Sequence, residues 1–307
     1  MITKNQQRLL LEQLIEGLEI PDSAYQKAEE RYQDIGDWLG RDGSLCAAYD
    51  PHVFPQGSFR LGTAIRPIDD GEPYDLDLAC KLQDGITKET HTQNELKLLV
   101  GNEIEAYRSA RGIKAPKEEK HRCWRLNYAD TLSFHMDIVP CIPADDSRRM
   151  LIEASMKSVG VDEYISASVS QHTVSITDDQ HPEYRQICDD WHISNPGGYA
   201  LWFESRMNQY RRLIADRAQI DKIPVYRQKT PLQRSIQLLK RHRDWRFKDA
   251  QDMKPISIII TTLAATAYDG EPDIVSALSS ILARMESLIN RDEPRVPNPV
   301  DPNEDFA

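Results

Sequence analysis

The fold is decided by two short stretches of the chain, QGSFRLGT at residues 56–63 and YDLDL at residues 74–78. Side chains two apart in a strand point to the same side, so Asp75 and Asp77 are expected to project together while the leucines beside them pack behind. A third aspartate, Asp137, stands within the later apolar run FHMDIVPCI. The sequence therefore predicts strands of one sheet with three carboxylates on one face.

Three converging carboxylates repel one another unless cations neutralise them. Hard oxygen ligands with open positions suit Mg²⁺, with Mn²⁺ as the alternative ion. Two ions about 4 Å apart can activate an attacking hydroxyl and stabilise a pyrophosphate leaving group. Asp75 and Asp77 are predicted to hold both ions and Asp137 to help hold the catalytic one. All three are therefore predicted catalytic and metal-binding residues.

The turn before these strands has the residues of a phosphate site. A glycine before a helix lets the backbone approach a phosphate closely, and the first turn of a helix presents free N–H groups to an anion. Ser58 can cap that helix or donate its hydroxyl to a phosphate oxygen. Gln56, Gly57 and Ser58 are therefore the predicted nucleotide-binding residues of this turn. Solvated carboxylates with a capping serine are the alternative, but the ordered set favours the catalytic interpretation.

Apolar spacing predicts the remaining elements. Strands are expected at 74–82, 124–128 and 134–142, and helices at 2–19, 22–39, 93–109, 199–218, 231–247 and 255–268. Residues 42–44 are predicted to form a turn, and residues 114–121 an exposed loop. The fold class is α+β (mixed α/β). The predicted division is N-terminal bracing helices at 1–44, a catalytic core at 45–194, a helical lobe at 195–290, and a proline- and acid-rich surface tail at 291–307.

Composition narrows the class of protein. The net charge is −11, yet residues 205–248 hold thirteen Lys and Arg against three Asp and Glu, so one basic segment stands in an acidic chain. That balance disfavours a general nucleic-acid binder and suits a small, highly charged ligand such as a nucleoside triphosphate. Five scattered cysteines, no secretory signal and no apolar run long enough for a membrane span predict a cytoplasmic protein without a membrane partner.

The motifs QGSFRLGTAIRP, YDLDLAC and FHMDIVP resemble the DNA polymerase beta-like nucleotidyltransferase superfamily. More narrowly, they resemble the CD-NTase family of bacterial cyclic-oligonucleotide synthases, relatives of animal cyclic GMP-AMP synthase and of oligoadenylate synthases. LQRSIQLLKRHRDWRF and KPISIIITTLAA are similar to the helical lobe of that family, so the resemblance spans nearly the whole chain. It implies a polymerase-beta-like core sheet with a C-terminal helical lobe.

The resemblance also implies roles for residues and partners. Lys240 and Ser257 match the lysine and serine that touch the triphosphate of the bound nucleotide. Nucleoside triphosphates, ATP or GTP or both, are the implied substrates, and the product is implied to be an anti-phage second messenger (CBASS-type) that acts on a separate effector. No cysteine and histidine cluster marks a zinc-binding insertion, so no DNA or RNA activator is expected.

Several alternatives stay open at this point. One is a different nucleotidyltransferase, which makes linear oligonucleotides or modifies a protein or small molecule. Another is an inactive nucleotide-binding scaffold. Arg122 and Arg125 are candidates for contact with a second nucleotide. Trp191 and Tyr199 are candidates for base stacking, although core packing is more frequent for aromatic side chains. A zinc site from His181, Cys188 and His192 is disfavoured because the spacing matches no common pattern.

Overall fold

The structure is a computed structural model that describes residues 3–69, 71–129, 133–208 and 229–307. A mixed seven-stranded sheet organises the part of the molecule that holds the three aspartates. Its main path runs β1-β2-β5-β4-β3, and β6 joins β5 to β7. The strands are β1 (Pro51–Gln56), β2 (Tyr74–Leu82), β3 (Glu118–Glu119), β4 (Trp124–Tyr128), β5 (Phe134–Pro143), β6 (Val174–Ile176) and β7 (His192–Ser194). Strands β2 and β5 are parallel, and the other pairs are antiparallel.

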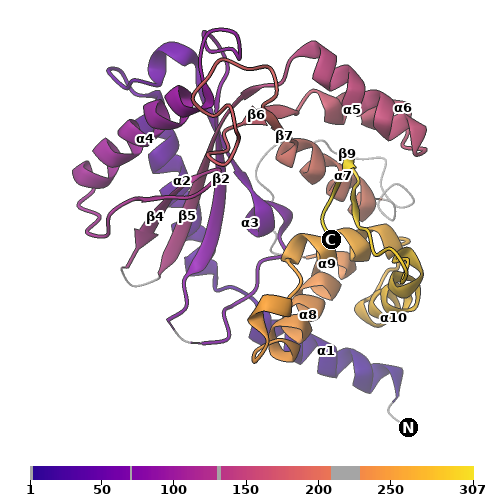
Figure 1. The fold of residues 1–307 in the computed structure, drawn as a ribbon. Helices are drawn as coiled ribbons and strands as arrows, with labels where there is room; N and C mark the ends of the chain where they lie inside the picture. Colours follow the sequence, from indigo (N-terminus) through magenta and orange to yellow (C-terminus); the bar gives the residue numbers. More distant parts are fainter. Residues whose placement is uncertain (1–2, 70, 130–132, 209–228) are drawn as a thin grey trace, which may run out of the picture.

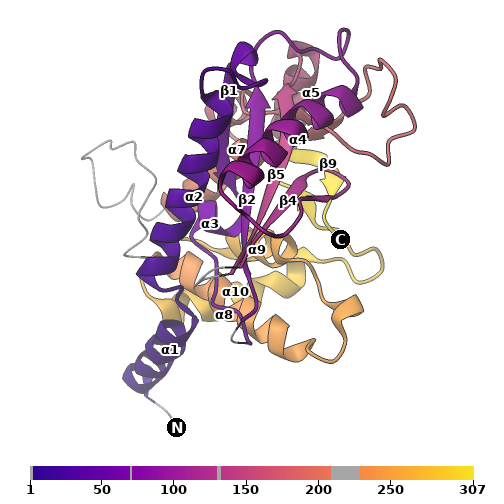
Figure 2. The same ribbon diagram turned by 90° about the vertical axis from the view of Figure 1, so that its left-hand side faces the viewer.

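Two long helices, α2 (Asp22–Gly40) and α4 (Gln93–Ala110), cover one face of this sheet (Figures 1 and 2). Leu76 and Leu78 of β2 point into this layer and are at most 1% exposed. Ile35 of α2 and Ile104 of α4 are fully buried in the same core. The alternation of β2 therefore places its leucines in the core and its aspartates on the opposite face.

A second core forms among the C-terminal helices. These are α7 (Pro196–Asn208), α8 (Pro231–Arg246), α9 (Ser257–Ala267) and α10 (Ile274–Met285). Helices α5 (Asp146–Ser158) and α6 (Glu163–Ser170), which sequence analysis places in the catalytic core, contribute Ile152, Met156 and Val169 to this second core. In Figure 1, α8, α9 and α10 lie beyond the short helix α3 (Gly57–Leu61), opposite α2 and α4.

The helices begin where their capping residues predict. Thr3 caps α1 (Lys4–Leu18), Thr92 caps α4 and Thr230 caps α8, each in a capping box with Gln or Glu three residues later. Helix α8 also has proline at its first position, where the missing N–H costs nothing. Helix α1 packs against both α8 and α10, so it joins the N-terminal helices to the helical lobe.

The predicted elements compare well with the structure, with several differences. The strands at 74–82 and 124–128 have the predicted bounds, and the mixed α/β fold class is confirmed. Strands β1, β6 and β7 are not predicted. Of the helix expected at 199–218, α7 accounts for the part up to Asn208, and residues 209–218 lie outside the described residues.

Two segments that were expected to lack regular structure form paired strands. The predicted loop at 114–121 contains β3, which pairs with the edge of β4. The predicted surface tail at 291–307 forms a hairpin of β8 (Pro297–Asn298) and β9 (Asp301–Asp305). Val296 and Val300 of this hairpin are at most 3% exposed, and Val300 belongs to the second core. Burial of these two apolar side chains explains why the segment is ordered despite its prolines and acids.

Candidate active site

Parallel pairing of β2 with β5 brings the three aspartates together. Asp77 lies directly opposite Asp137, and Asp75 lies opposite His135. Met136 and Ile138, on either side of Asp137, are fully buried, so the aspartates face away from the α2 and α4 layer. The predicted convergence of Asp75, Asp77 and Asp137 on one sheet face agrees with this geometry.

Gly57 is the point of closest approach between the turn and the carboxylates. Gln56 pairs with Asp77 across β1 and β2, and Gly57 follows with a φ of +65°. A Cβ atom on Gly57 would lie 2.2 Å from Oδ2 of Asp77. Glycine is therefore required here for the left-handed backbone and for the space beside the carboxylate.

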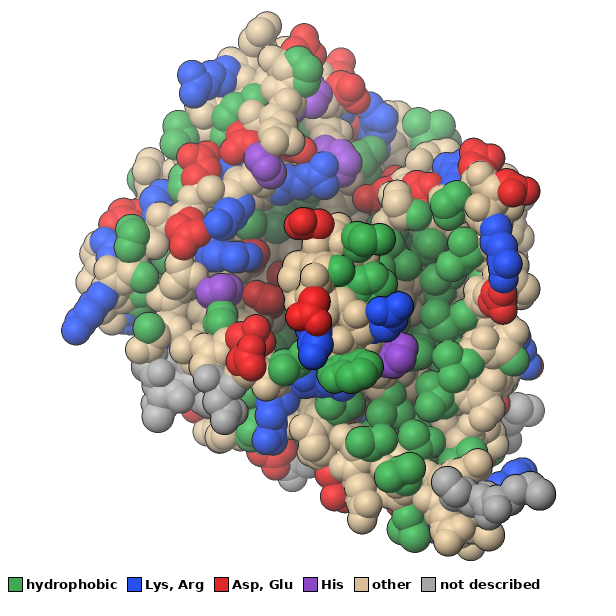
Figure 3. All heavy atoms as spheres, turned by 60° about the horizontal axis from the view of Figure 1, so that its bottom comes forward, with side chains coloured by type: hydrophobic (Ala, Val, Ile, Leu, Met, Phe, Trp, Pro, Cys, Tyr) green, Lys and Arg blue, Asp and Glu red, His purple; other side chains and the backbone are tan. Residues whose placement is uncertain are grey.

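A cleft of about 750 Å³ opens between the sheet and the helical lobe. One wall holds Gly57, Ser58, Asp75 and Asp77, and the other holds Lys240 and Ser257, among others. The predicted residues from both lobes therefore line one cavity. Basic and acidic side chains surround a hollow on the face shown in Figure 3.

Gln56 and Asp137 are predicted site residues that do not line this cleft. The side-chain amide of Gln56 donates to the carbonyl oxygen of Leu78 at 3.3 Å, which stabilises the strand pair. Gln56 therefore reaches the site through its backbone, as the residue preceding α3. Asp137 lies behind Asp77 in the sheet order, next to β4.

Asp77 and Lys240 have opposite charges and opposite pKa shifts. Burial, followed by the neighbouring charges of Asp137 and Asp75, raises the pKa of Asp77 to about 7. Burial, followed by repulsion from Arg243, lowers the pKa of Lys240 to about 7. Burial therefore disfavours the charged form of both side chains. Such shifted pKa values are typical of functional sites.

Lys240 is held in place by a residue that sequence analysis does not single out. Its Nζ donates to the carbonyl oxygen of Thr63 at 3.2 Å and lies 3.1 Å from the Thr63 hydroxyl. Both residues are at most 4% exposed. The contact fixes α8 against the end of the 56–63 turn. The position of Thr63 within QGSFRLGT was the only sign of this role in the sequence.

Arg243 is a second cleft residue that sequence analysis does not select. Its Nη1 donates to the hydroxyl of Ser257 at 2.8 Å, and its Nη2 donates to Asp244 at 2.6 Å. Lys254 also pairs with Asp244, at 2.9 Å. Because Ser257 accepts from Arg243, its own hydroxyl hydrogen is available for a phosphate oxygen. The signal in the sequence was the spacing of three residues from Lys240, which places both cations on one helix face.

Asp137 makes a two-point ion pair with Arg125 of β4. Nε of Arg125 lies 2.7 Å from Oδ1, and Nη2 lies 2.8 Å from Oδ2. Asp137 is thus the partner of Arg125, whereas Arg122 pairs with Asp178 at 2.8 Å. Arg125 therefore belongs to the carboxylate cluster, and Arg122 does not.

The donor set fits a magnesium ion in its chemistry. Asp75 and Asp77 offer hard carboxylate oxygens on one strand face, and the raised pKa of Asp77 reflects repulsion that a cation would relieve. Across the described ranges, no three His, Cys, Asp or Glu side chains are grouped so that they could hold a metal ion. The third carboxylate, Asp137, instead directs both oxygens to Arg125.

The two aromatic candidates for base stacking are buried in the protein core. Trp191 and Tyr199 are 2% and 7% exposed, so core packing holds for both rather than base stacking. The described residues also show no metal cluster around His181, Cys188 and His192.

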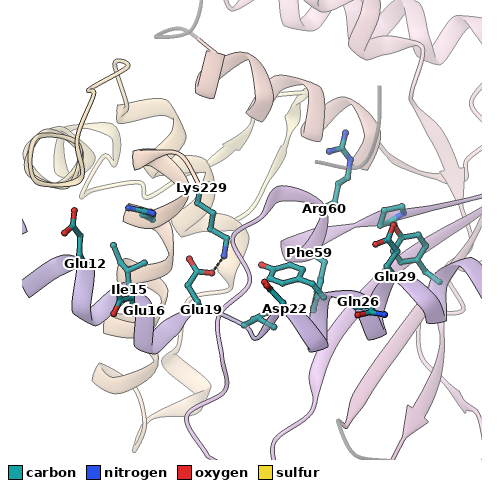
Figure 4. A pocket seen from close by; sticks show the side chains of 16 residues that line it. Glu12, Ile15, Glu16, Glu19, Asp22, Gln26, Glu29, Phe59, Arg60 and Lys229 are labelled. Carbon is teal, nitrogen blue, oxygen red and sulfur yellow. Dashed lines mark hydrogen bonds and ion pairs between the residues drawn. The ribbon is translucent and has the colours of Figure 1, made fainter. Parts of the chain in front are cut away.

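A second cavity, of about 670 Å³, lies between α1, α2, α3 and the start of α8 (Figure 4). Five carboxylates line it: Glu12, Glu16, Glu19, Asp22 and Glu29. Lys229 points into it but is bound to Glu19, and Arg60 is paired with Glu204 at 2.7 Å. The lining thus holds five carboxylates against three cations, of which Arg234 is the third. This acidic excess disfavours a triphosphate here and favours the cleft between the lobes as the nucleotide site.

Comparison with known proteins agrees with the geometry of the cleft. Residues 51–141 match the family model described as cyclic GMP-AMP synthase DncV-like, nucleotidyltransferase domain. The chain is 29% identical over 321 residues to a c-di-GMP synthase of Roseivirga ehrenbergii, a match that covers 100% of this chain and 74% of that relative. The chain is therefore similar to the CD-NTase nucleotidyltransferases, over residues 51–141 by the family model and over its whole length by the Roseivirga relative.

Solved structures show the same fold. The CD-NTase CdnG of Bradyrhizobium diazoefficiens, solved with GTP, has a TM-score of 0.67 at 21% identity, covering 96% of this chain and 82% of that one. The Vibrio cholerae DncV cyclic AMP-GMP synthase, solved with a linear intermediate, has a TM-score of 0.61 at 14% identity, covering 95% and 80%. No helix within the described ranges is both long and apolar enough to cross a membrane.

Replacing Lys240 with alanine is expected to raise the KM for nucleoside triphosphate about tenfold or more, with a smaller effect on kcat, because a lysine on the triphosphate mainly binds the ground state. Since the pKa of Lys240 is about 7, its charge is lost as the pH rises above 7. The wild-type KM should therefore increase from pH 7 to pH 9, and this increase should be smaller in Lys240→Ala.

The check is steady-state kinetics with calorimetric nucleotide titration at both pH values. Arg246→Ala is the matched control, because it removes one positive charge from the exposed side of the same helix. Unchanged nucleotide affinity in Lys240→Ala would show that Lys240 does not bind the triphosphate.

Proposed function

We propose that this protein is a cyclic-oligonucleotide synthase, which joins nucleoside triphosphates with release of pyrophosphate and closes the product into a ring. One observation supports this most directly. The carboxylates of Asp75 and Asp77 face a cleft whose opposite wall holds Lys240 and Ser257, so acidic and phosphate-binding groups lie across one cavity. The names of the relatives, a c-di-GMP synthase and a cyclic AMP-GMP synthase, support the same class of reaction.

The two walls of the cleft would have different roles. Gly57 and Ser58 would receive phosphate oxygens of the donor nucleotide, and Lys240 with Ser257 would bind its triphosphate from the helical lobe. Asp75 and Asp77, with Asp137, would hold divalent cations. Bound Mg²⁺ would lower the pKa of the attacking ribose hydroxyl and neutralise charge on the leaving pyrophosphate. A second transfer with the nucleotide roles exchanged would close the ring.

GTP and ATP are the proposed substrates. The Roseivirga relative is named a c-di-GMP synthase and CdnG was solved with GTP, so GTP is the first nucleotide to test. The proposed product is a cytoplasmic second messenger for anti-phage signalling that acts on a separate effector protein.

The decisive test is product analysis. The protein is incubated with labelled ATP, GTP, CTP and UTP and with Mg²⁺, and the products are treated with phosphatase and identified by mass spectrometry. A phosphatase-resistant cyclic product supports the proposal. A linear product or a nucleotidylated protein would indicate another nucleotidyltransferase, and no nucleotide turnover at all would favour a scaffold.

Long DNA or RNA is expected neither to bind tightly nor to stimulate the reaction. A chain of net charge −11 repels a polyanion overall, and salt weakens the remaining phosphate contacts. The basic segment 205–248 is the candidate footprint for a polyanion, and Lys240 within it lines the cleft. Product formation is measured with and without duplex DNA and RNA at about 150 mM salt. Stimulation of several-fold would contradict this prediction.

A further inference from the structure

The contact between Arg125 and Asp137 has a consequence for metal binding, which rests on the proposed function. Register pairs the two residues directly across β4 and β5. The guanidinium meets the carboxylate edge to edge, at 2.7 and 2.8 Å, and the two side chains are only 25% and 21% exposed. Such two-point, charge-assisted pairs are among the stronger contacts that a carboxylate makes.

Two features make Arg125 a competitor of cations for the carboxylate of Asp137. It uses one acceptor position on each oxygen of Asp137, and it places a fixed positive charge beside them. Glu118 is opposite Arg125 in the β3–β4 register but is bound to Lys120 and Asn127, each at 2.6 Å. Arg125 is therefore committed to Asp137.

The guanidinium of Arg125 also has a donor available for a different partner. Its Nη1 has no hydrogen-bond partner within the part of the chain that the structure describes. The strand register places Arg125, Asp137 and Asp77 side by side on one sheet face, across β4, β5 and β2. An incoming triphosphate is a better partner for a guanidinium than one shared carboxylate, because it offers several charged oxygens.

We propose that Arg125 is a positioning residue that withholds Asp137 from divalent cations until a nucleoside triphosphate draws the guanidinium away. Nucleotide binding and complete metal loading are then coupled, and the coupling passes through one side chain. The protein alone holds cations weakly, while the nucleotide complex releases Asp137 to them.

The test is calorimetric titration of Mn²⁺ into the full chain without nucleotide. Arg125→Gln is expected to bind Mn²⁺ about tenfold more tightly than wild type, because the competing charge is gone. Arg122→Gln is the matched control, since it breaks an arginine–aspartate pair outside the cluster, and its Mn²⁺ affinity should equal that of wild type. A merely structural role for Arg125 would give the opposite sign, with weaker binding in a loosened site.

A second titration includes a non-hydrolysable nucleoside triphosphate analogue. The advantage of Arg125→Gln over wild type should then fall to less than about threefold, because the triphosphate has already displaced Arg125 in the wild type. Unchanged or weaker Mn²⁺ affinity in nucleotide-free Arg125→Gln overturns the proposal, as does an advantage that persists undiminished with the analogue.

Two further measurements keep the test decisive. If Arg125→Gln does not fold, Arg125→Lys replaces it, since lysine keeps the charge but cannot make the two-point contact, and an intermediate affinity is expected. If wild type binds no Mn²⁺ even with the analogue and forms no product, the proposed function fails. If wild type binds Mn²⁺ and makes product while the variants do not differ from it, only the role of Arg125 fails.

Discussion

Asp77→Asn is expected to lower the rate of product formation by roughly 10³-fold, because it removes a ligand charge from the centre of the carboxylate cluster. Asp77 lies opposite Asp137 and beside Gly57, at the centre of the cluster and next to the turn. Asp75→Asn should also abolish most activity, since both aspartates project from the same face of β2. Product formation by mass spectrometry is the measurement.

The same substitution is expected to stabilise the protein without metal. The folded state raises the pKa of Asp77 from 3.8 to about 7, so the folded protein holds a proton that the unfolded chain releases. Stability from this group is complete below pH 3.8 and is lost as the pH rises through 7. Asparagine removes that loss, at roughly 1.4 kcal/mol per pKa unit. The temperature of unfolding of Asp77→Asn should therefore exceed that of wild type at pH 8, in buffer with a chelator.

Asp146→Asn is the matched control for both measurements, because the Asp146 side chain is 93% exposed on α5, outside the residues that line the cleft. It should leave the rate and the unfolding temperature unchanged. Turnover near the wild-type value in Asp77→Asn would refute the assignment of this carboxylate to the active site.

Gly57→Ala is expected to reduce product formation about a hundredfold, because the new methyl group would meet Oδ2 of Asp77 at 2.2 Å. The contact cannot be tolerated, so either the turn or the carboxylate must move. Alanine also pays roughly 1 kcal/mol or more for a φ of +65°. The variant should therefore be less stable than wild type and catalytically impaired beyond its loss of stability.

Gly43→Ala separates these two effects. Gly43 has a φ of +82°, but no atom lies within 4 Å of the position where its Cβ would be. It should lose a similar free energy of unfolding from the backbone alone and keep its activity. Urea unfolding and product assays at a temperature where both variants are folded give the comparison. Equal activity in the two variants would show that the approach of Gly57 to Asp77 is not needed for the reaction.

Much of the site was predictable from local sequence. The alternation in YDLDL predicts that Asp75 and Asp77 share a face while Leu76 and Leu78 are buried, and the structure confirms this. The period of two in a strand is a property of the backbone, so it needs no knowledge of distant residues. The helices were predictable for the same reason, because capping threonines and apolar spacing act within a few residues.

The remainder depended on contacts between residues far apart in the chain. Lys240 reaches Thr63 across 177 positions, and no local pattern indicates that partner. The edge strand β3 and the hairpin around Val300 form because neighbouring surfaces accept their backbone and side chains. The sequence by itself determined which residues carry charge and which face each strand buries. Only the tertiary structure decided that Arg125 meets Asp137, because strand order and register, unlike periodicity, are set by packing of the whole sheet.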